Sequence, residues 1–228
     1  MSASNQILLR GTYIVVRVDG RGFTKFCLQH KIKRPIDDRL CNVMLAAGKE
    51  VMNQFQDIVF GYGQSDEFSF VLRKSSTLFE RNRDLIISSV VSVFTANFVF
   101  KWSEFFPSTP LQQAPAFDSR AVLYTTSQNI HDYLSWRQAD SHINSLYNYT
   151  LCVIMRTGLS GPEATEVLTG TFSPQKNDIL RKHGIDFMML PESHRRGTTY
   201  IRVNGEIVSS TEDMILDKFW DKYGYIVE

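Results

Sequence analysis

The sequence has few cysteines and no strong excess of charge of either sign. Its three cysteines (Cys27, Cys41 and Cys152) show no close pairing, which disfavours a disulfide framework or a zinc site. Lysine and arginine number 25 against 24 aspartate and glutamate, so the formal net charge is +1. This balance disfavours a protein that holds nucleic acid simply by being basic. Such cysteine usage is typical of a reducing compartment, and we expect a cytoplasmic protein, with a mitochondrial location left open.

Long hydrophobic runs are also missing, glycine and proline are few, and the three prolines at 107–115 predict a loop. The most apolar stretch, residues 85–102, is interrupted by serine, threonine, asparagine and lysine, so it predicts a core helix and no membrane partner. The first ten residues lack the apolar run of a signal peptide. With 43% hydrophobic residues among 228, and only 13 glycines and 7 prolines, the chain predicts a large core with short connections.

The hydrophobic pattern predicts an α+β fold. In chain order we expect a strand at 13–18, a helix at 37–55, a hairpin at 58–72, a long helix at 77–102 and a strand at 120–124. Thr77 and Glu80 have the spacing of a capping box, which predicts the start of the long helix. This order is that of a ferredoxin-like layout, an antiparallel sheet with helices on one face.

The second half of the chain predicts mainly helices. The expected elements are helices at 127–155, 163–169, 173–183 and 211–223 and a hairpin at 200–208 around Asn204-Gly205. No composition change marks a linker, so we predict one domain, with a core at about 13–126 and a helical and hairpin region at about 127–228.

Two acidic residues lie where predicted strands end. Asp19 follows the first strand and Asp66 lies at the bend of the hairpin. In a ferredoxin-like order these strands are neighbours, so both carboxylates can lie at the same edge of the sheet. Hard cations such as Mg²⁺ prefer oxygen ligands of this kind, and Glu67 could assist catalysis as a further ligand or by supporting the ligands. The alternative is structural, because Asp-Gly and Ser-Asp pairs are common in turns.

Several longer motifs occur in a fixed order. They are RVDGRGFTKF at 17–26, RPIDDR at 34–39, YGQSDEFSF at 62–70, FDSR at 117–120, WRQAD at 136–140, HINSLYN at 142–148 and RRG at 195–197. Together they resemble the tRNA-His guanylyltransferase family, which includes reverse-direction (3′–5′) RNA polymerases and guanylyltransferase-like proteins. The resemblance extends from Tyr13 to Val203.

The resemblance implies a polymerase palm fold and a metal-dependent nucleotidyltransferase that acts on the 5′ end of tRNA. It implies two Mg²⁺ ions held by Asp19, the Gly20 carbonyl and Asp66, with Glu67 adjacent. ATP and GTP are implied as substrates, and a homotetramer (a dimer of dimers) as the assembly.

Further site residues follow from the same resemblance. It implies nucleotide binding by Arg21, Gly22, Phe23, Lys33, Arg34, Asp37, Ser65 and Arg120. It implies contact with a triphosphate or the tRNA 5′ end for Arg81, Arg83, His142, Asn148 and Lys176. Structural explanations stand beside these roles: His142 fits a polar core position, and Arg120 fits an exposed surface charge.

The sequence departs from the family pattern early in the long helix and in the histidine motif. Asn82 and Leu85 stand where an arginine and a lysine are expected, and Ser145 replaces an asparagine. These departures favour a protein that repairs or edits tRNA 5′ ends by templated addition. The alternatives are guanylate addition to tRNA-His and a non-catalytic tRNA-binding paralogue. A nucleotidyl cyclase is disfavoured by the histidine motif.

Overall fold

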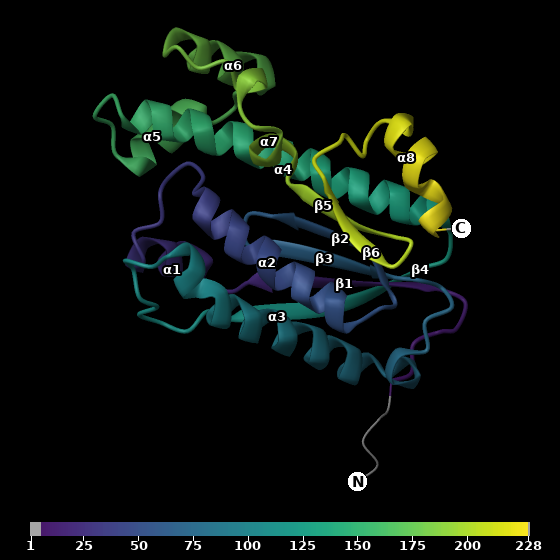
Figure 1. Ribbon diagram of the computed structural model, residues 1–228. Coiled ribbons are helices and arrows are strands. Elements are labelled where there is room, and N and C mark those ends of the chain that lie inside the picture. Colours follow the sequence, from purple (N-terminus) through teal and green to yellow (C-terminus); the bar gives the residue numbers. More distant parts are fainter. Residues whose placement is uncertain (1–5, 228) are drawn as a thin grey trace.

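The computed structural model describes residues 6–227, and its centre is a six-stranded antiparallel sheet (Figure 1). The strand order is β4-β1-β3-β2-β5-β6. The strands are β1 (Tyr13–Gly20), β2 (Ile58–Gln64), β3 (Glu67–Leu72), β4 (Phe117–Tyr124), β5 (Thr198–Val203) and β6 (Glu206–Ser210). The first four strands have the predicted ferredoxin-like order. The predicted C-terminal hairpin, β5–β6, extends the same sheet by pairing with β2.

Helices cover both faces of the sheet, with those of the first half on one face and α4 and α8 on the other (Figure 1). The helices are α1 (Phe23–Gln29), α2 (Asp38–Gln54), α3 (Arg83–Phe105), α4 (Ser127–Met155), α5 (Gly161–Leu168), α6 (Ser173–Lys182), α7 (Glu192–Arg196) and α8 (Asp217–Tyr223). Short 3-10 helices lie between or after these helices, at Leu78–Arg81, Phe187–Met189 and Gly224–Val227. The α+β prediction is confirmed. Helix α1 was not predicted, and α8 is shorter than the predicted 211–223.

Apolar side chains that alternate between the two faces of the sheet form two hydrophobic cores. On β1, Ile14, Val16 and Val18 face α2 and α3, where they join a large cluster that includes Phe94 and Phe98. The other face of the same strand joins a second cluster with residues of α4 and α8. Because successive side chains of a strand point to opposite faces, one apolar strand can serve both layers. The central strands are therefore buried on both sides.

Helix α3 begins at Arg83, six residues after Thr77, where the predicted capping box begins. The side chain of Asn82 accepts hydrogen bonds from the amides of Asp84 and Leu85, so Asn82 is the N-cap. The preceding residues Phe79, Glu80 and Arg81 have φ values of 48°, 54° and 63°, in the left-handed region. A right-handed helix cannot run through this turn. The prediction from Thr77 was wrong because the turn depends on contacts with the N-terminal segment.

Helix α3 is long and apolar enough to span a membrane by length and composition alone. Here one face of it is buried in the large core, through Ile86, Val90, Phe94, Phe98 and Trp102. Several polar groups on the helix donate to the carbonyl four residues earlier, including the hydroxyls of Ser92 and Thr95. These local bonds explain how the helix accommodates its serines and threonines.

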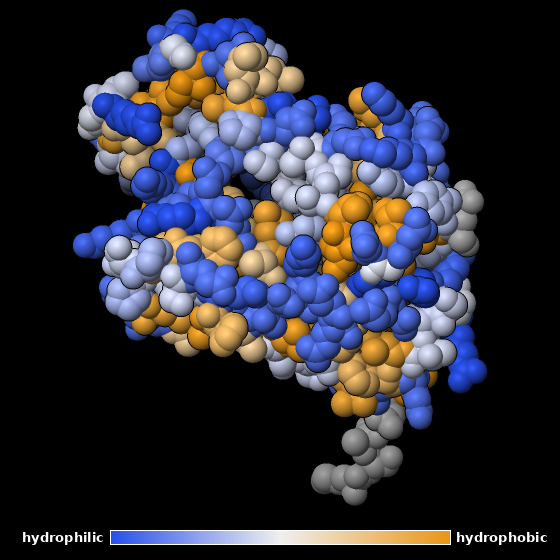
Figure 2. Space-filling model, in the orientation of Figure 1, coloured by the Kyte–Doolittle hydropathy of each residue, from blue (hydrophilic) through white to orange (hydrophobic). Residues whose placement is uncertain are grey.

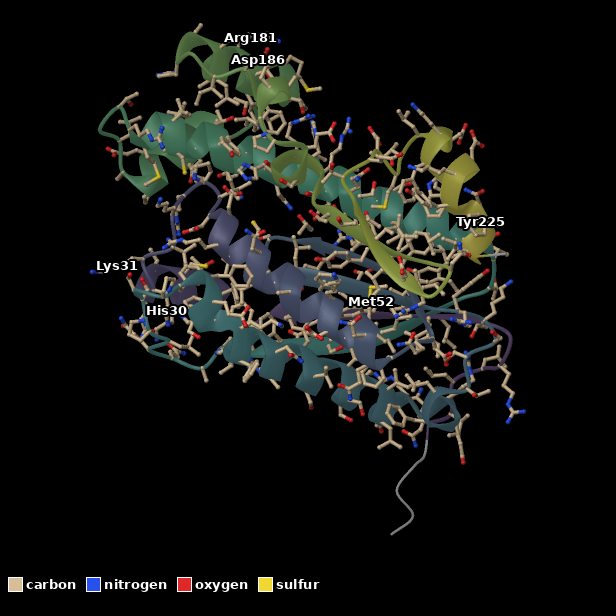
Figure 3. The ribbon with its side chains drawn as sticks, viewed as in Figure 1. His30, Lys31, Met52, Arg181, Asp186 and Tyr225 are labelled. Atoms are coloured by element: carbon tan, nitrogen blue, oxygen red, sulfur yellow. The ribbon has the colours of Figure 1, made fainter. Side chains whose placement is uncertain are left out.

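Helix α4 continues past the edge of the sheet and carries a separate C-terminal arm. Its N-terminus has a capping box formed by Thr126 and Asn129. At its far end, α5 and α6 pack against it through small clusters of their own. Figure 3 shows Arg181 and Asp186 on this arm, away from the sheet. The arm and the α1–α2 layer therefore face each other across an open space, which Figure 2 shows as a hollow between the two parts.

Candidate active site

The two acids singled out from the sequence meet at one edge of the sheet. Asp19 is the penultimate residue of β1 and lies opposite Glu67 in the antiparallel register with β3. The amide of Gly20 donates to the carbonyl of Asp66 at 3.0 Å, which ties the end of β1 to the β2–β3 turn. In that turn Ser65 has a φ of 52°, and its hydroxyl donates to the Asp66 carboxylate at 3.0 Å. The topology thus places Asp19, Asp66 and Ser65 together.

Gly20 occupies a position with no room for a side chain. A Cβ atom there would lie 2.5 Å from Cδ2 of Phe23 and 2.9 Å from Cβ of Asp66. The lack of a side chain lets the backbone between the two acids lie close to both neighbours. The family resemblance implies the Gly20 carbonyl as an oxygen ligand beside the two carboxylates.

The donor set fits a hard cation that also binds substrate phosphates. Magnesium commonly takes one or two protein carboxylates and completes its shell with phosphates and water. Burial raises the pKa of Asp66, and the neighbouring negative charge of Asp19 raises that pKa further, against the hydrogen bond from Ser65. A divalent cation would offset both costs. In residues 6–227 no group of three or more His, Cys, Asp or Glu side chains is placed to hold a metal, so substrate oxygens would have to complete the shell.

Asp19 and Asp66 line a cleft of about 610 Å³. Its walls come from β1, the β2–β3 turn, α1, α2, α4 and α7, and its predicted site residues are Asp19, Phe23, Lys33, Arg34, Asp37, Ser65, Asp66, Glu67 and Asn148. The volume is in the range of small-molecule sites. The cleft thus collects most of the predicted nucleotide-binding residues.

The loop before α2 forms one wall of the cleft and is organised by Asp37. This carboxylate caps α2 and accepts from the Arg39 amide (3.1 Å), the Arg39 side chain (2.7 and 2.9 Å) and the Lys33 amide (2.9 Å). Burial opposes its charged form, but the hydrogen bonds from Arg39 and Lys33 outweigh burial and lower the pKa of Asp37. Asp37 therefore fixes the loop that presents Lys33 and Arg34 to the cleft.

Helix α4 contributes a polar wall that includes Asp140, Ser141, Asn144, Ser145 and Asn148. The hydroxyl of Ser145 is buried and makes no hydrogen bond to any residue among 6–227. Burying a hydroxyl without a partner is unfavourable, so this oxygen is a candidate contact for a bound ligand. Of these residues, only Asn148 was predicted from the sequence to contact a ligand.

Two arginines at the site, Arg17 and Arg137, were not among the predicted site residues. Arg17 on β1 contacts Asp19 at 2.6 Å and Glu67 at 2.5 Å. Arg137 on α4 contacts Glu67 at 3.0 Å. Glu67 is thus already paired with two cations, which argues against a further role as metal ligand. The signal for both arginines was only their position inside the longer motifs.

A histidine that received no role also lines the cleft. His194 on α7 contacts the Asp38 carboxylate through Nε2 at 2.6 Å and the Tyr149 hydroxyl through Nδ1 at 2.8 Å. These contacts link α7, α2 and α4 across the cleft. Asp38 and His194 are 156 residues apart, so no local pattern could have indicated the pair.

Arg81 does not lie at the cleft, and the structure contradicts its predicted contact with a triphosphate. Its side chain is buried and donates to the carbonyls of Leu8, Leu9, Thr12 and Ser76. A guanidinium used in this way is not available to a phosphate. Arg81 instead joins the N-terminal segment to the left-handed turn before α3.

Other predicted residues lie outside the cleft lining. Arg120 is exposed on β4 opposite Arg17 and pairs with Asp118 at 3.2 Å. Lys176 on α6 donates to the carbonyl of Thr171 at 2.6 Å. The other five are Gly20, Arg21, Gly22, Arg83 and His142, and of these Gly20 directly follows Asp19, which does line the cleft. Gly22 is the left-handed N-cap of α1.

His142 lies on α4 beside the ring of Phe187, with 5.2 Å between ring centroids. Burial lowers the pKa of His142, and the charges of Arg195 and Arg196 lower it further. Its predicted contact with the tRNA 5′ end remains a prediction.

Comparison with known proteins gives matches along almost the whole chain. A model described as tRNAHis guanylyltransferase matches residues 2–125, and one described as Thg1 C terminal domain matches residues 128–220. A probable tRNA(His) guanylyltransferase of Dictyostelium discoideum is 45% identical and covers 95% of this chain and 91% of its own. The tRNA(His) guanylyltransferase of Schizosaccharomyces pombe is 47% identical and covers 86% of this chain and 75% of its own.

Solved structures agree with the sequence matches. The tRNA(His) guanylyltransferase of Saccharomyces cerevisiae superposes with a TM-score of 0.86 at 38% identity, covering 92% of this chain and 93% of its own. A bacterial guanylyltransferase-like protein in complex with ATP gives a TM-score of 0.82 at 24% identity, covering 98% and 93%, which supports the fold. The resemblance seen in the motifs is confirmed: this chain belongs to the tRNA(His) guanylyltransferase family and is a nucleotidyltransferase.

Proposed function

We propose that this chain is a metal-dependent 3′–5′ nucleotidyltransferase that adds nucleotides to the 5′ end of tRNA. The observation that carries the proposal is that Asp19 and Asp66 both line a cleft large enough for a nucleotide, with the backbone of Gly20 packed closely against Asp66. Membership of the family and the names of the relatives support the substrate.

Different residues of the cleft would have different roles in the reaction. Asp19, Asp66 and the Gly20 carbonyl would hold up to two Mg²⁺ ions, which would supply stabilisation of the attacking and leaving oxygens of phosphoryl transfer. Lys33 and Arg34, on the loop fixed by Asp37, are placed to bind phosphate or base groups of ATP or GTP. The α4 wall, with Ser145 and Asn148, would contact the sugar or the RNA end.

Two versions of the reaction are supported by different observations. The curated relatives named above are called tRNA(His) guanylyltransferases, which supports addition of a guanylate to tRNA(His). The departures at Leu85 and Ser145 support templated repair of shortened tRNA 5′ ends. Asn82 no longer counts toward repair, because capping of α3 explains that residue.

An incorporation assay tests the proposal and separates the two versions. Full-length tRNA(His) lacking its extra guanylate and a 5′-shortened tRNA of another kind are each offered in monophosphorylated and triphosphorylated form with labelled NTPs and Mg²⁺. We expect incorporation that falls by at least about 10³-fold in Asp19→Asn and Asp66→Asn. Incorporation that survives both substitutions overturns the assigned site, and tRNA binding without incorporation favours the non-catalytic alternative.

Two finer points belong to the same proposal. A homotetramer is supported by the family resemblance and by apolar side chains left exposed on α3, such as Phe100, which is 77% exposed. A cytoplasmic or mitochondrial location remains the expectation from cysteine usage. Light scattering of the purified protein tests the assembly.

A further inference from the structure

A chain of four charged side chains runs from helix α4 to the first acid of the site. Arg137 contacts Oε2 of Glu67 at 3.0 Å, and the same oxygen lies 2.5 Å from Nη2 of Arg17. That nitrogen also contacts Oδ2 of Asp19 at 2.6 Å. Three elements, α4, β3 and β1, contribute to this chain, and 70 residues separate Glu67 from Arg137.

Burial decreases along the chain toward the cleft. The side chains of Arg137 and Glu67 are 5% and 7% exposed, whereas those of Arg17 and Asp19 are 26% and 30% exposed. The buried end is held further, because the Arg137 guanidinium lies 4.0 Å from the ring centroid of Trp136 and contacts Asp140 at 3.3 Å. A rigid inner end and an open outer end suit a support that orients a carboxylate at the cleft.

This network of ion pairs has a high desolvation free energy, which is hard to explain if the network serves only stability. Buried ion pairs often contribute little net stability because desolvation offsets their attraction. Arg17 and Arg137 each also keep a buried Nε without an acceptor within residues 6–227. Apolar residues of similar size would avoid both costs. The network therefore fits a role in fixing positions.

We propose that Arg137 is a positioning residue for Asp19. Arg137 holds Glu67, Glu67 fixes the guanidinium of Arg17, and Arg17 orients the Asp19 carboxylate beside Asp66. Glu67 then acts as the anion between two guanidinium groups. This inference rests on the proposed function, in which Asp19 and Asp66 bind a divalent cation. It also means that α4, which forms the opposite wall of the cleft, is connected to the cation site.

The experiment measures Mn²⁺ binding to the full chain by electron paramagnetic resonance, with Mn²⁺ alone as the probe. Arg137→Lys keeps the positive charge but removes the fork that reaches Glu67 and Asp140 together. We expect the dissociation constant for Mn²⁺ to rise about 10-fold, in the range typical of lost supporting contacts around a metal site. The same substitution in a Glu67→Gln background is expected to cause no further change, because the connection is already broken.

A matched control is Arg181→Lys, which changes an exposed arginine paired with Asp178 on α6 and is expected to leave Mn²⁺ affinity unchanged. If Arg137 only holds α4 in place, Arg137→Lys lowers the melting temperature while the folded protein keeps its Mn²⁺ affinity, and the proposal is wrong. Should Arg137→Lys fail to fold, Glu67→Asp shortens the connection and is expected to weaken Mn²⁺ binding similarly; wild-type affinity would count against the proposal.

Failure of the cation site itself is recognised separately. Wild-type Mn²⁺ affinity in both Asp19→Asn and Asp66→Asn would contradict the proposed function. Loss of binding in these two variants, with wild-type binding in Arg137→Lys and its Glu67 partner variants, would contradict only the positioning role.

Discussion

Gly20 and Asp66 are joined by a backbone hydrogen bond of 3.0 Å that connects the end of β1 to the β2–β3 turn. The bond brings a residue next to Asp19 into contact with the other acid. A side chain at Gly20 would intrude on both Phe23 and Asp66. The geometry of the site therefore depends on this one close approach.

Gly20→Ala is expected to reduce nucleotide incorporation by more than about tenfold and to lower the free energy of unfolding by about 1–3 kcal/mol, because the added methyl overpacks the site. Urea denaturation and the incorporation assay measure the two effects. Gly161→Ala is the control: it lies in the first turn of α5 with no atom closer than 4.0 Å, so stability should stay the same or rise slightly. Full activity in Gly20→Ala would show that the close approach is dispensable.

Much of this fold could be predicted because local patterns and tertiary structure agree. The predicted bounds of α4, residues 127–155, agree with the observed helix, and the order of the first strands places Asp19 and Asp66 together. The start of α3 could not be predicted, since Thr77 offers a good local cap while contacts of Arg81 with the N-terminal segment select another turn. The roles of Arg17 and His194 depend on partners brought together only by folding.

Arg81→Met is expected to lower the free energy of unfolding by about 2–4 kcal/mol, because several buried carbonyls lose their donor and the left-handed turn at 79–81 loses its support. The KM for NTP of the fraction that folds should not change. Arg83→Met is the matched comparison: Arg83 is partly exposed and pairs only weakly with Asp84, so its stability effect should stay below about 0.5 kcal/mol. A raised KM for NTP in Arg81→Met at unchanged stability would restore its predicted triphosphate role.

Asp37→Asn should lower the free energy of unfolding by about 1–3 kcal/mol at pH 7, because the α2 cap and the charged contacts with Arg39 weaken. The pKa of Asp37 is lowered in the folded state, so its contribution is complete above the ordinary value of 3.8 and is lost as the pH falls through the lowered pKa. The difference between wild type and Asp37→Asn should therefore narrow below about pH 4. Urea titrations at pH 7, 5 and 3 measure this difference, and a gap that widens on acidification would contradict the sign.

Ser145→Ala separates a ligand contact from a structural one. The Ser145 hydroxyl is buried and lacks a partner among the described residues, so its removal should leave the free energy of unfolding unchanged or raise it by up to about 1 kcal/mol. If the hydroxyl contacts a bound nucleotide or RNA end, the KM for that substrate should rise about 3- to 10-fold, as expected for one lost hydrogen bond. Thr150→Val is the control, since the Thr150 hydroxyl donates to the Leu146 carbonyl within α4 and does not line the cleft. Unchanged KM for both NTP and tRNA in Ser145→Ala would show that the α4 wall does not contact substrate at this position.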